Sequence, residues 1–143
     1  MPALADTSAW IEFFHPKGRA EVKQVLAEAL EDGAVVTVAP VLTELLVGLE
    51  PGRAADARAI ERLRSLEMID LPWHVCMRAG ALGRSLARRG RRVPTADLMI
   101  AAAAAAGGHD IWHVGDNHFA AIERAGGPRQ RDLRDDSRAG RPV

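Results

Sequence analysis

Acidic residues stand in four short motifs whose other residues are mostly apolar or small. The motif acids are Asp6 in LADTSAW, Glu44 in VLTEL, Asp97 in PTADLMIAA and Asp116 in HVGDNHF. A carboxylate beside apolar residues costs free energy unless it is paired, hydrogen-bonded or bound to a cation. No lysine or arginine stands within four residues of Asp6 or Glu44. We therefore hypothesise a shared divalent ion, and oxygen ligands favour Mg²⁺ or Mn²⁺ over Zn²⁺.

Each motif acid also has a simpler interpretation when it is taken alone. Asp6 is a preferred residue type for capping a helix N-terminus, and Asp97 could do no more than complement a helix dipole. Asp116 followed by Asn117 is typical of an ordinary turn. Only the combination of all the motifs favours a metal site.

The sequence predicts alternating strands and helices around these acids. Short apolar or β-branched segments predict strands at about residues 3–5, 35–38, 68–71 and 111–114. Apolar residues at helical spacing predict helices at about 7–14, 20–31, 40–48, 54–66, 73–89, 96–106 (with Thr95 as N-cap) and 117–125. This alternation indicates a parallel α/β sandwich.

Ligands of parallel α/β sheets bind beyond the carboxyl ends of the strands. Asp6 and Asp116 come just after predicted strands, and Asp97 falls in the first turn of a predicted helix. These acids can therefore meet at one edge of the sheet.

Length and composition fit one domain with a hydrophobic core. The chain has 143 residues, 48% of them hydrophobic, and its formal net charge is zero, so overall charge gives no sign of a nucleic-acid partner. The single cysteine, Cys76, cannot form an intramolecular disulfide, and the sequence begins with no basic and apolar leader. We expect a cytoplasmic protein. The apolar segment 98–106 is too short for a membrane span, which needs about 20 residues.

Together the motifs resemble those of PIN-domain proteins, and among these the VapC-type ribonuclease toxins of prokaryotic toxin–antitoxin pairs. The resemblance runs from about Ala3 to Phe119 or slightly beyond, and DTSAW and ADLMIAA are its most specific parts. It implies a PIN-like three-layer α/β/α sandwich with a central, mostly parallel sheet of about four to five short strands. It also implies an endoribonuclease that depends on Mg²⁺ or Mn²⁺, forms a homodimer and is neutralised by a small VapB-type antitoxin.

The resemblance assigns roles to the candidate site residues. The metal would be held by Asp6, Asp97 and Asp116, with Glu44 acting directly or through a bound water. One-metal and two-metal mechanisms both stay open. Neighbouring hydroxyl groups would orient carboxylates or water, and they belong to Thr7, Ser8 and Thr95. The antitoxin is expected on the exposed surface of the first helices, which includes Trp10, Ile11 and Phe14.

Two further features concern the RNA and the chemistry. His118 stands about where many relatives carry another acid, and contact with RNA, proton transfer and a surface position without catalytic duty are all open. An arginine cluster precedes the Asp97 motif and could contact RNA phosphates or form a solvated helix end. It consists of Arg88, Arg89, Arg91 and Arg92.

The C-terminal segment departs most from the family pattern. Segment 126–134 contains only one large apolar residue, Leu133, and Pro128 removes a hydrogen-bond donor. We expect at most a short edge strand at about 129–133. A nuclease domain over 1–135 would then be followed by a flexible polar tail over 136–143.

The sequence leaves two alternative functions open. One is a PIN-domain ribonuclease of RNA processing that has no antitoxin, and another is a catalytically lapsed binding module. The lapsed module ranks last because all the motif acids are present. A small open reading frame just upstream would favour the toxin.

Overall fold

The computed structural model describes residues 1–135 and has a parallel sheet at its centre. The sheet has five strands, β1 (Ala3–Ala5), β2 (Val35–Val38), β3 (Glu67–Ile69), β4 (Ile111–His113) and β5 (Gln130–Asp132). Their order is β3-β2-β1-β4-β5, and every pairing is parallel. The strand order therefore reverses direction at β1, which lies between β2 and β4.

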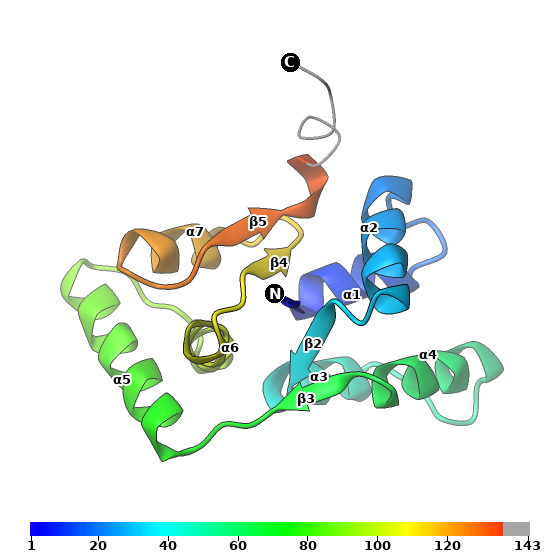
Figure 1. Ribbon diagram of the computed structural model, residues 1–143, viewed down its shortest axis with the longest axis horizontal. Coiled ribbons are helices and arrows are strands. Elements are labelled where there is room, and N and C mark those ends of the chain that lie inside the picture. Colours follow the sequence, from blue (N-terminus) through cyan, green and yellow to red (C-terminus); the bar gives the residue numbers. More distant parts are fainter. Residues whose placement is uncertain (136–143) are drawn as a thin grey trace.

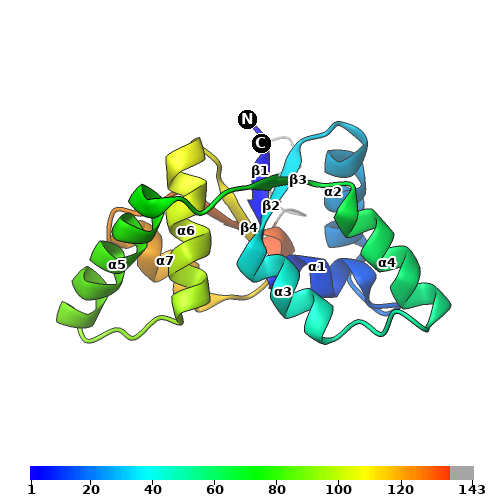
Figure 2. The same ribbon diagram turned by 90° about the horizontal axis from the view of Figure 1, so that it is seen from below.

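Helices cover both faces of this sheet. They are α1 (Thr7–Phe14), α2 (Ala20–Glu31), α3 (Ala39–Val47), α4 (Ala54–Arg64), α5 (Trp73–Arg88), α6 (Thr95–Gly107) and α7 (Asn117–Arg124), and a 3-10 turn, η1 (Leu133–Asp135), follows β5. Figures 1 and 2 show α1, α2 and α4 on one side of the sheet and α5, α6 and α7 on the other. The predicted three-layer α/β/α sandwich is confirmed.

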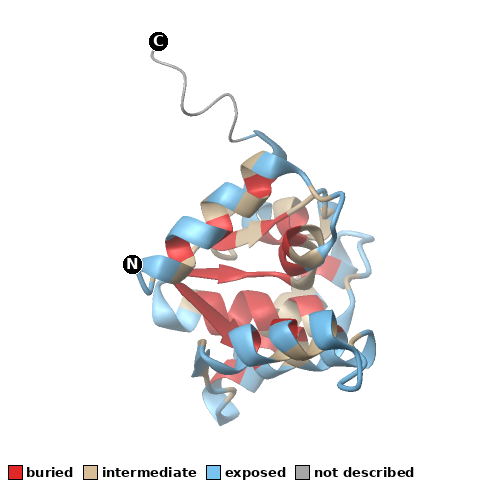
Figure 3. Ribbon diagram, turned by 90° about the vertical axis from the view of Figure 1, so that its right-hand side faces the viewer, coloured by how far each residue is buried: buried red, intermediate tan, exposed pale blue. Residues whose placement is uncertain are grey.

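The strands β1 and β2 are buried along their whole length, as the apolar segments predicted. Every residue of β1 and β2 is buried, and Figure 3 shows the buried residues gathered on the strands and on the inward faces of the helices. Helix α6 contributes a run of buried alanines, 101–104. Their small side chains allow the helix to pack closely, and α6 contacts both α5 and β1.

The topology places the motif acids at one edge of the sheet. Asp6 follows β1 directly, Asp116 lies between β4 and α7, and α3 with Glu44 follows β2 without a loop. Ligands of open α/β sheets bind at the carboxyl ends of the strands, where the strand order reverses. That position in this sheet is the carboxyl end of β1 and β4.

Most predicted element bounds lie within two residues of the observed ones. Thr95 is the first residue of α6 and not its N-cap, because the cap position is Pro94 and no side chain caps this helix. The expected edge strand is present as β5, which is short and pairs only with β4. The predicted tail, 136–143, lies outside the described residues.

Within residues 1–135, none of the helices has the length and apolar character needed to cross a membrane.

Candidate metal centre

Asp6 is held at the junction between β1 and α1. It occupies the N-cap position of α1, where its Oδ2 accepts hydrogen bonds from the backbone N–H of Ser8 at 3.3 Å and from the Ser8 hydroxyl at 2.8 Å. The Ser8 Oγ also accepts a hydrogen bond from the backbone N–H of Val114 at 3.0 Å. Ser8 thus connects Asp6 to the end of β4, which is the neighbouring strand.

Asp116 has the same role at the start of α7. Its Oδ1 caps the helix by accepting the backbone N–H of His118 at 2.9 Å. The backbone N–H of Asp116 donates to Nδ1 of His113 at 3.1 Å. Because Nδ1 accepts that bond, the imidazole proton is on Nε2, which faces Oε1 of Gln130 on β5. His113 is buried and therefore fixes the loop that carries Asp116.

Asp97 lies in the first turn of α6, where the residue is only 8% exposed. No hydrogen bond or ion pair joins its carboxylate to another group within residues 1–135. The pKa of Asp97 is raised to about 7, mainly by burial and then by the charges of Asp116, Asp6 and Glu44. The negative charge of every other motif acid therefore acts on the carboxylate of Asp97.

The pKa of Asp6 is raised as well. Burial is the largest cause, the hydrogen bonds from Ser8 oppose it, and the charge of Asp116 adds to it. Two buried carboxyl groups with raised pKa values mark a place where the charged forms lack compensation. A divalent cation would supply that compensation.

Glu44 differs from the other motif acids because it is exposed on α3. Its Oε1 accepts a hydrogen bond of 3.3 Å from the Thr7 hydroxyl, which ties α3 to the first turn of α1. Glu44 also lines a cavity of about 320 Å³ whose other lining residues include Ile11, Phe14 and Leu49. Thr95, the remaining candidate with a hydroxyl, is exposed at the start of α6.

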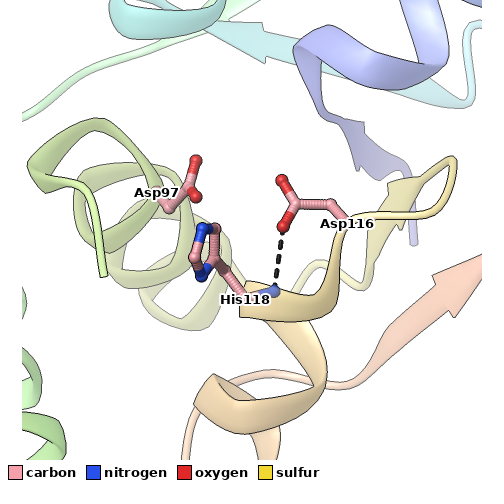
Figure 4. Close-up of side chains that lie close together, drawn as sticks. All are labelled: Asp97, Asp116 and His118. Carbon is pink, nitrogen blue, oxygen red and sulfur yellow. Dashed lines mark hydrogen bonds between the residues drawn. The ribbon is translucent and has the colours of Figure 1, made fainter. Parts of the chain in front are cut away.

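The donors that lie closest together come from α6 and from the first turn of α7. One ligand atom from each of Asp97, Asp116 and His118 lies within 4.8 Å of the others. Figure 4 shows Asp97 and Asp116 facing one another, with the His118 ring beside them. Two carboxylates and an imidazole fit a divalent ion, and the unpartnered Asp97 carboxylate gives that ion a buried anionic ligand.

The arginine cluster is exposed at the end of α5 and in the loop before α6. The Nη1 of Arg89 donates to the backbone carbonyl of Arg124 at 3.4 Å. Figure 2 shows the α5–α6 loop leading into the N-terminal turn of α6, which carries Asp97. The cluster therefore leads directly into the turn that carries Asp97, and within residues 1–135 it forms no ion pair with the motif acids.

Sequence reasoning missed His113 and Gln130 as supports of the site. His113 was visible as a polar residue at the end of an apolar strand, three positions before Asp116. Gln130 gave no signal, because its contact with His113 depends on the pairing of β4 with β5.

The expectation of an exposed surface that includes Trp10 was wrong. Trp10 is fully buried, and its ring packs against Phe13 and Phe14. Ile11 is exposed, and Ile11 and Phe14 both line the cavity beside Glu44.

Comparison with known proteins identifies one family and several solved structures that share this fold. The model of the PIN domain family matches residues 3–125. A chain of VapBC2 from Rickettsia felis, in a structure with a DNA fragment from the promoter, matches with a TM-score of 0.75. The two chains are 19% identical, and the match covers 92% of this chain and 98% of that one.

Two other solved structures give the same fold. DNA-bound VapBC from Salmonella typhimurium has a TM-score of 0.70 at 23% identity, over 93% of this chain and 99% of that chain. VapBC-5 from Mycobacterium tuberculosis, a member of the VapBC family of toxin–antitoxin systems, has a TM-score of 0.62 at 28% identity, over 92% and 96%. No curated protein sequence matches this chain.

Proposed function

Because the chain belongs to the PIN-domain family, we propose that it is a divalent-metal-dependent endoribonuclease and the toxin of a toxin–antitoxin pair. The observation that carries the proposal is the grouping of Asp97, Asp116 and His118, whose ligand atoms lie within 4.8 Å of one another. Burial and the charges of Asp116, Asp6 and Glu44 raise the pKa of Asp97 in this group. Residues from separate motifs thus meet in one acidic centre. A lapsed binding module would have no need to maintain such an unfavourable group of charges.

Each motif acid has a distinct place in the proposed chemistry. A bound Mg²⁺ or Mn²⁺ supplies Lewis-acid chemistry, since it makes water more acidic and offsets negative charge on phosphate oxygens. Asp6, Asp97 and Asp116 hold the ion. Glu44, which is more exposed, orients an attacking water or binds the ion through one.

Hydroxyl groups orient the carboxylates. Ser8 fixes Oδ2 of Asp6, and Thr7 restrains Oε1 of Glu44. Such neighbours tune the ligands that they touch. Thr95 remains a candidate of the same kind, because it stands two residues before Asp97.

The arginine cluster is proposed to bind the RNA backbone. Its exposed guanidinium groups precede the helix that carries Asp97. Positive charge beside an acidic centre would hold the phosphates on either side of the scissile bond.

The proposed antitoxin would occupy the cavity beside Glu44. The apolar side chains of Ile11, Phe14, Leu45 and Leu49 line part of this cavity, and Glu44 lies in its wall. A partner segment that inserts an apolar side chain here would also block the acidic centre. VapBC-5 from Mycobacterium tuberculosis, which has this fold, is a member of the VapBC family of toxin–antitoxin systems, which supports a partner of this class. The homodimer remains a proposal that rests on the resemblance to VapC-type toxins.

The test is cleavage of defined RNAs by the purified protein with Mg²⁺, with Mn²⁺ or with EDTA. We expect cleavage with either metal, no cleavage with EDTA, and none by Asp97→Asn in any condition. Cleavage that persists in EDTA, or in the folded variant, would contradict the proposal.

The toxin role has a separate test in living cells. Expression of the chain should arrest growth, and co-expression of the small open reading frame expected beside its gene should relieve the arrest. Growth arrest that no neighbouring reading frame relieves would favour a ribonuclease of RNA processing instead.

A further inference from the structure

His118 is fixed beside the acidic centre by the first turn of α7. Its backbone N–H donates to Oδ1 of Asp116, which is the cap of that helix. The side chain is half-buried, and Figure 4 shows its ring beside the carboxylate of Asp97. Among residues 1–135, no hydrogen bond or ion pair involves the nitrogens of this ring. A nitrogen of the imidazole is therefore available to bind a metal ion beside Asp97 and Asp116.

Asp97 supplies an independent sign that a cation belongs here. The residue as a whole is 8% exposed, its carboxylate points toward Asp116, and it has no hydrogen-bond partner within the described residues. An unpaired carboxylate in such a position costs free energy that a bound ion removes. The ion must therefore approach Asp97 closely, which also brings it to His118.

The spacing of the three side chains suits direct coordination. Ligand atoms on opposite sides of an ion, each about 2.1 Å from it, lie about 4.2 Å apart. The atoms of Asp97, Asp116 and His118 lie within 4.8 Å of one another. Small side-chain rotations would close the remaining gap.

We propose that His118 is a ligand of the metal through an imidazole nitrogen, and that this ligand makes the site prefer first-row transition ions to Mg²⁺. The proposal rests on the proposed metal-dependent function. Magnesium takes oxygen ligands and keeps several waters, whereas imidazole binds transition ions well, with affinities that rise from Mn²⁺ to Co²⁺. Replacing an oxygen donor by imidazole therefore changes which ion is held, and not only how tightly.

The first test measures metal binding without RNA, by titration calorimetry with Co²⁺, Mn²⁺ and Mg²⁺. His118→Ala should lower the affinity for Co²⁺ by about tenfold or more, lower that for Mn²⁺ less, and lower that for Mg²⁺ least. His74→Ala is the matched control, because His74 is exposed on α5. Equal losses for all three ions, or no loss, would overturn the proposal.

The second test is spectroscopic and needs no catalysis. Pulsed electron paramagnetic resonance of bound Mn²⁺ should show a ¹⁴N coupling in the wild type and in His74→Ala. The coupling should disappear in His118→Ala, and in His118→Asn if the alanine variant does not fold. A wild-type spectrum without this coupling, or a coupling that survives both substitutions, would show that His118 is not a ligand.

These outcomes separate the inference from the proposed function. Metal-dependent RNA cleavage together with a missing nitrogen coupling would overturn the role of His118 and leave the ribonuclease standing. Mn²⁺ bound with the coupling, but without cleavage of any RNA, would support His118 as a ligand and contradict the ribonuclease.

Discussion

Two carboxylates in this protein, those of Asp6 and Asp116, each cap a helix and are also proposed metal ligands. Each caps its helix with one carboxylate oxygen, and the charge of each raises the pKa of Asp97. The two interpretations that sequence offered, helix cap and metal ligand, are therefore compatible. What sequence could not supply were the contacts between distant residues, such as the bond from the backbone of Val114 to Ser8, across 106 positions. Such contacts follow from strand pairing and have no local signature.

Asp97 should make the metal-free protein less stable as pH rises. Its folded pKa of about 7 lies above the ordinary value of 3.8, so between these pH values the folded state binds the proton more tightly than the unfolded chain. The free energy of unfolding therefore falls as pH rises through this window and levels off above it. Asp97→Asn removes the ionisation and should flatten the profile, with stability at about pH 8 equal to or above that of the wild type.

Denaturant unfolding in EDTA, from about pH 4 to about pH 8, measures this effect. The raised pKa of Asp6 should leave a smaller slope in the variant. A variant with the full wild-type slope, or one that is destabilised at high pH, would contradict the account of Asp97.

Ser8→Ala should weaken both the fold and the site. The substitution leaves the Val114 N–H without its acceptor and removes the hydroxyl donor to Asp6, at a cost of about 1–2 kcal/mol in unfolding free energy. Cleavage should fall, but by less than in Asp6→Asn, because the carboxylate itself remains. Ser85→Ala on α5 is the control, measured by the same unfolding and cleavage assays. Equal effects of the two serine substitutions would remove the special role of Ser8.

Helices and strands were predictable here to the extent that their signals are local. The strand Val35–Val38 and the helix Ala20–Glu31 begin and end where hydrophobic pattern and flanking Asp-Gly placed them. Thr95 was misplaced by one position, because a residue with good capping chemistry can also begin the helix. Arg129 and Leu133 were expected within the edge strand, whereas β5 spans only Gln130–Asp132. The pairing with β4 decides those limits, and sequence does not show it.

The arginine cluster is expected to act as one element, the end of α5 with the loop that follows. Replacing Arg88, Arg89, Arg91 and Arg92 with Gln should weaken RNA binding and flatten its dependence on salt. Each lost phosphate contact should reduce the slope of log affinity against log salt by about 0.7. The control replaces Arg58 and Arg64 on α4 with Gln, which removes arginine charges away from the cluster. Because it removes two charges and not four, the change in slope is compared per arginine replaced. Filter binding between low and high salt gives the slope, and an unchanged slope would mean that the cluster is merely solvated.

The stability of the whole domain is expected to depend on Leu133, a residue near the end of the described chain. Leu133 is fully buried in η1, which contacts α2, although its surroundings in sequence are polar. Leu133→Ala should lower the free energy of unfolding by about 2–4 kcal/mol. Truncation after Asp135 should leave the melting temperature and cleavage nearly unchanged, because it keeps this residue. A large loss of stability on truncation, or a small one in Leu133→Ala, would show that the boundary of the folded unit is wrongly placed.

The overall architecture brings Asp97 and Asp116, which belong to separate motifs, within 4.8 Å of one another, and the charges of Asp6 and Glu44 reach Asp97. That the acids could meet at one edge of the sheet was predictable from sequence, and that all of them share a metal stays a prediction. The predicted meeting of the acids followed from one rule, that parallel strands present their carboxyl ends at the same edge. The identity of the ion and its ligands did not follow, since those depend on side-chain positions such as that of His118.

Anomalous X-ray scattering from crystals soaked in Mn²⁺ tests the central claim most directly. The account predicts a manganese peak in contact with Asp6, Asp97 and Asp116 and close to Glu44, and no such peak in crystals of Asp97→Asn. A peak elsewhere in the molecule, or an empty centre at a Mn²⁺ concentration that supports RNA cleavage, would contradict it.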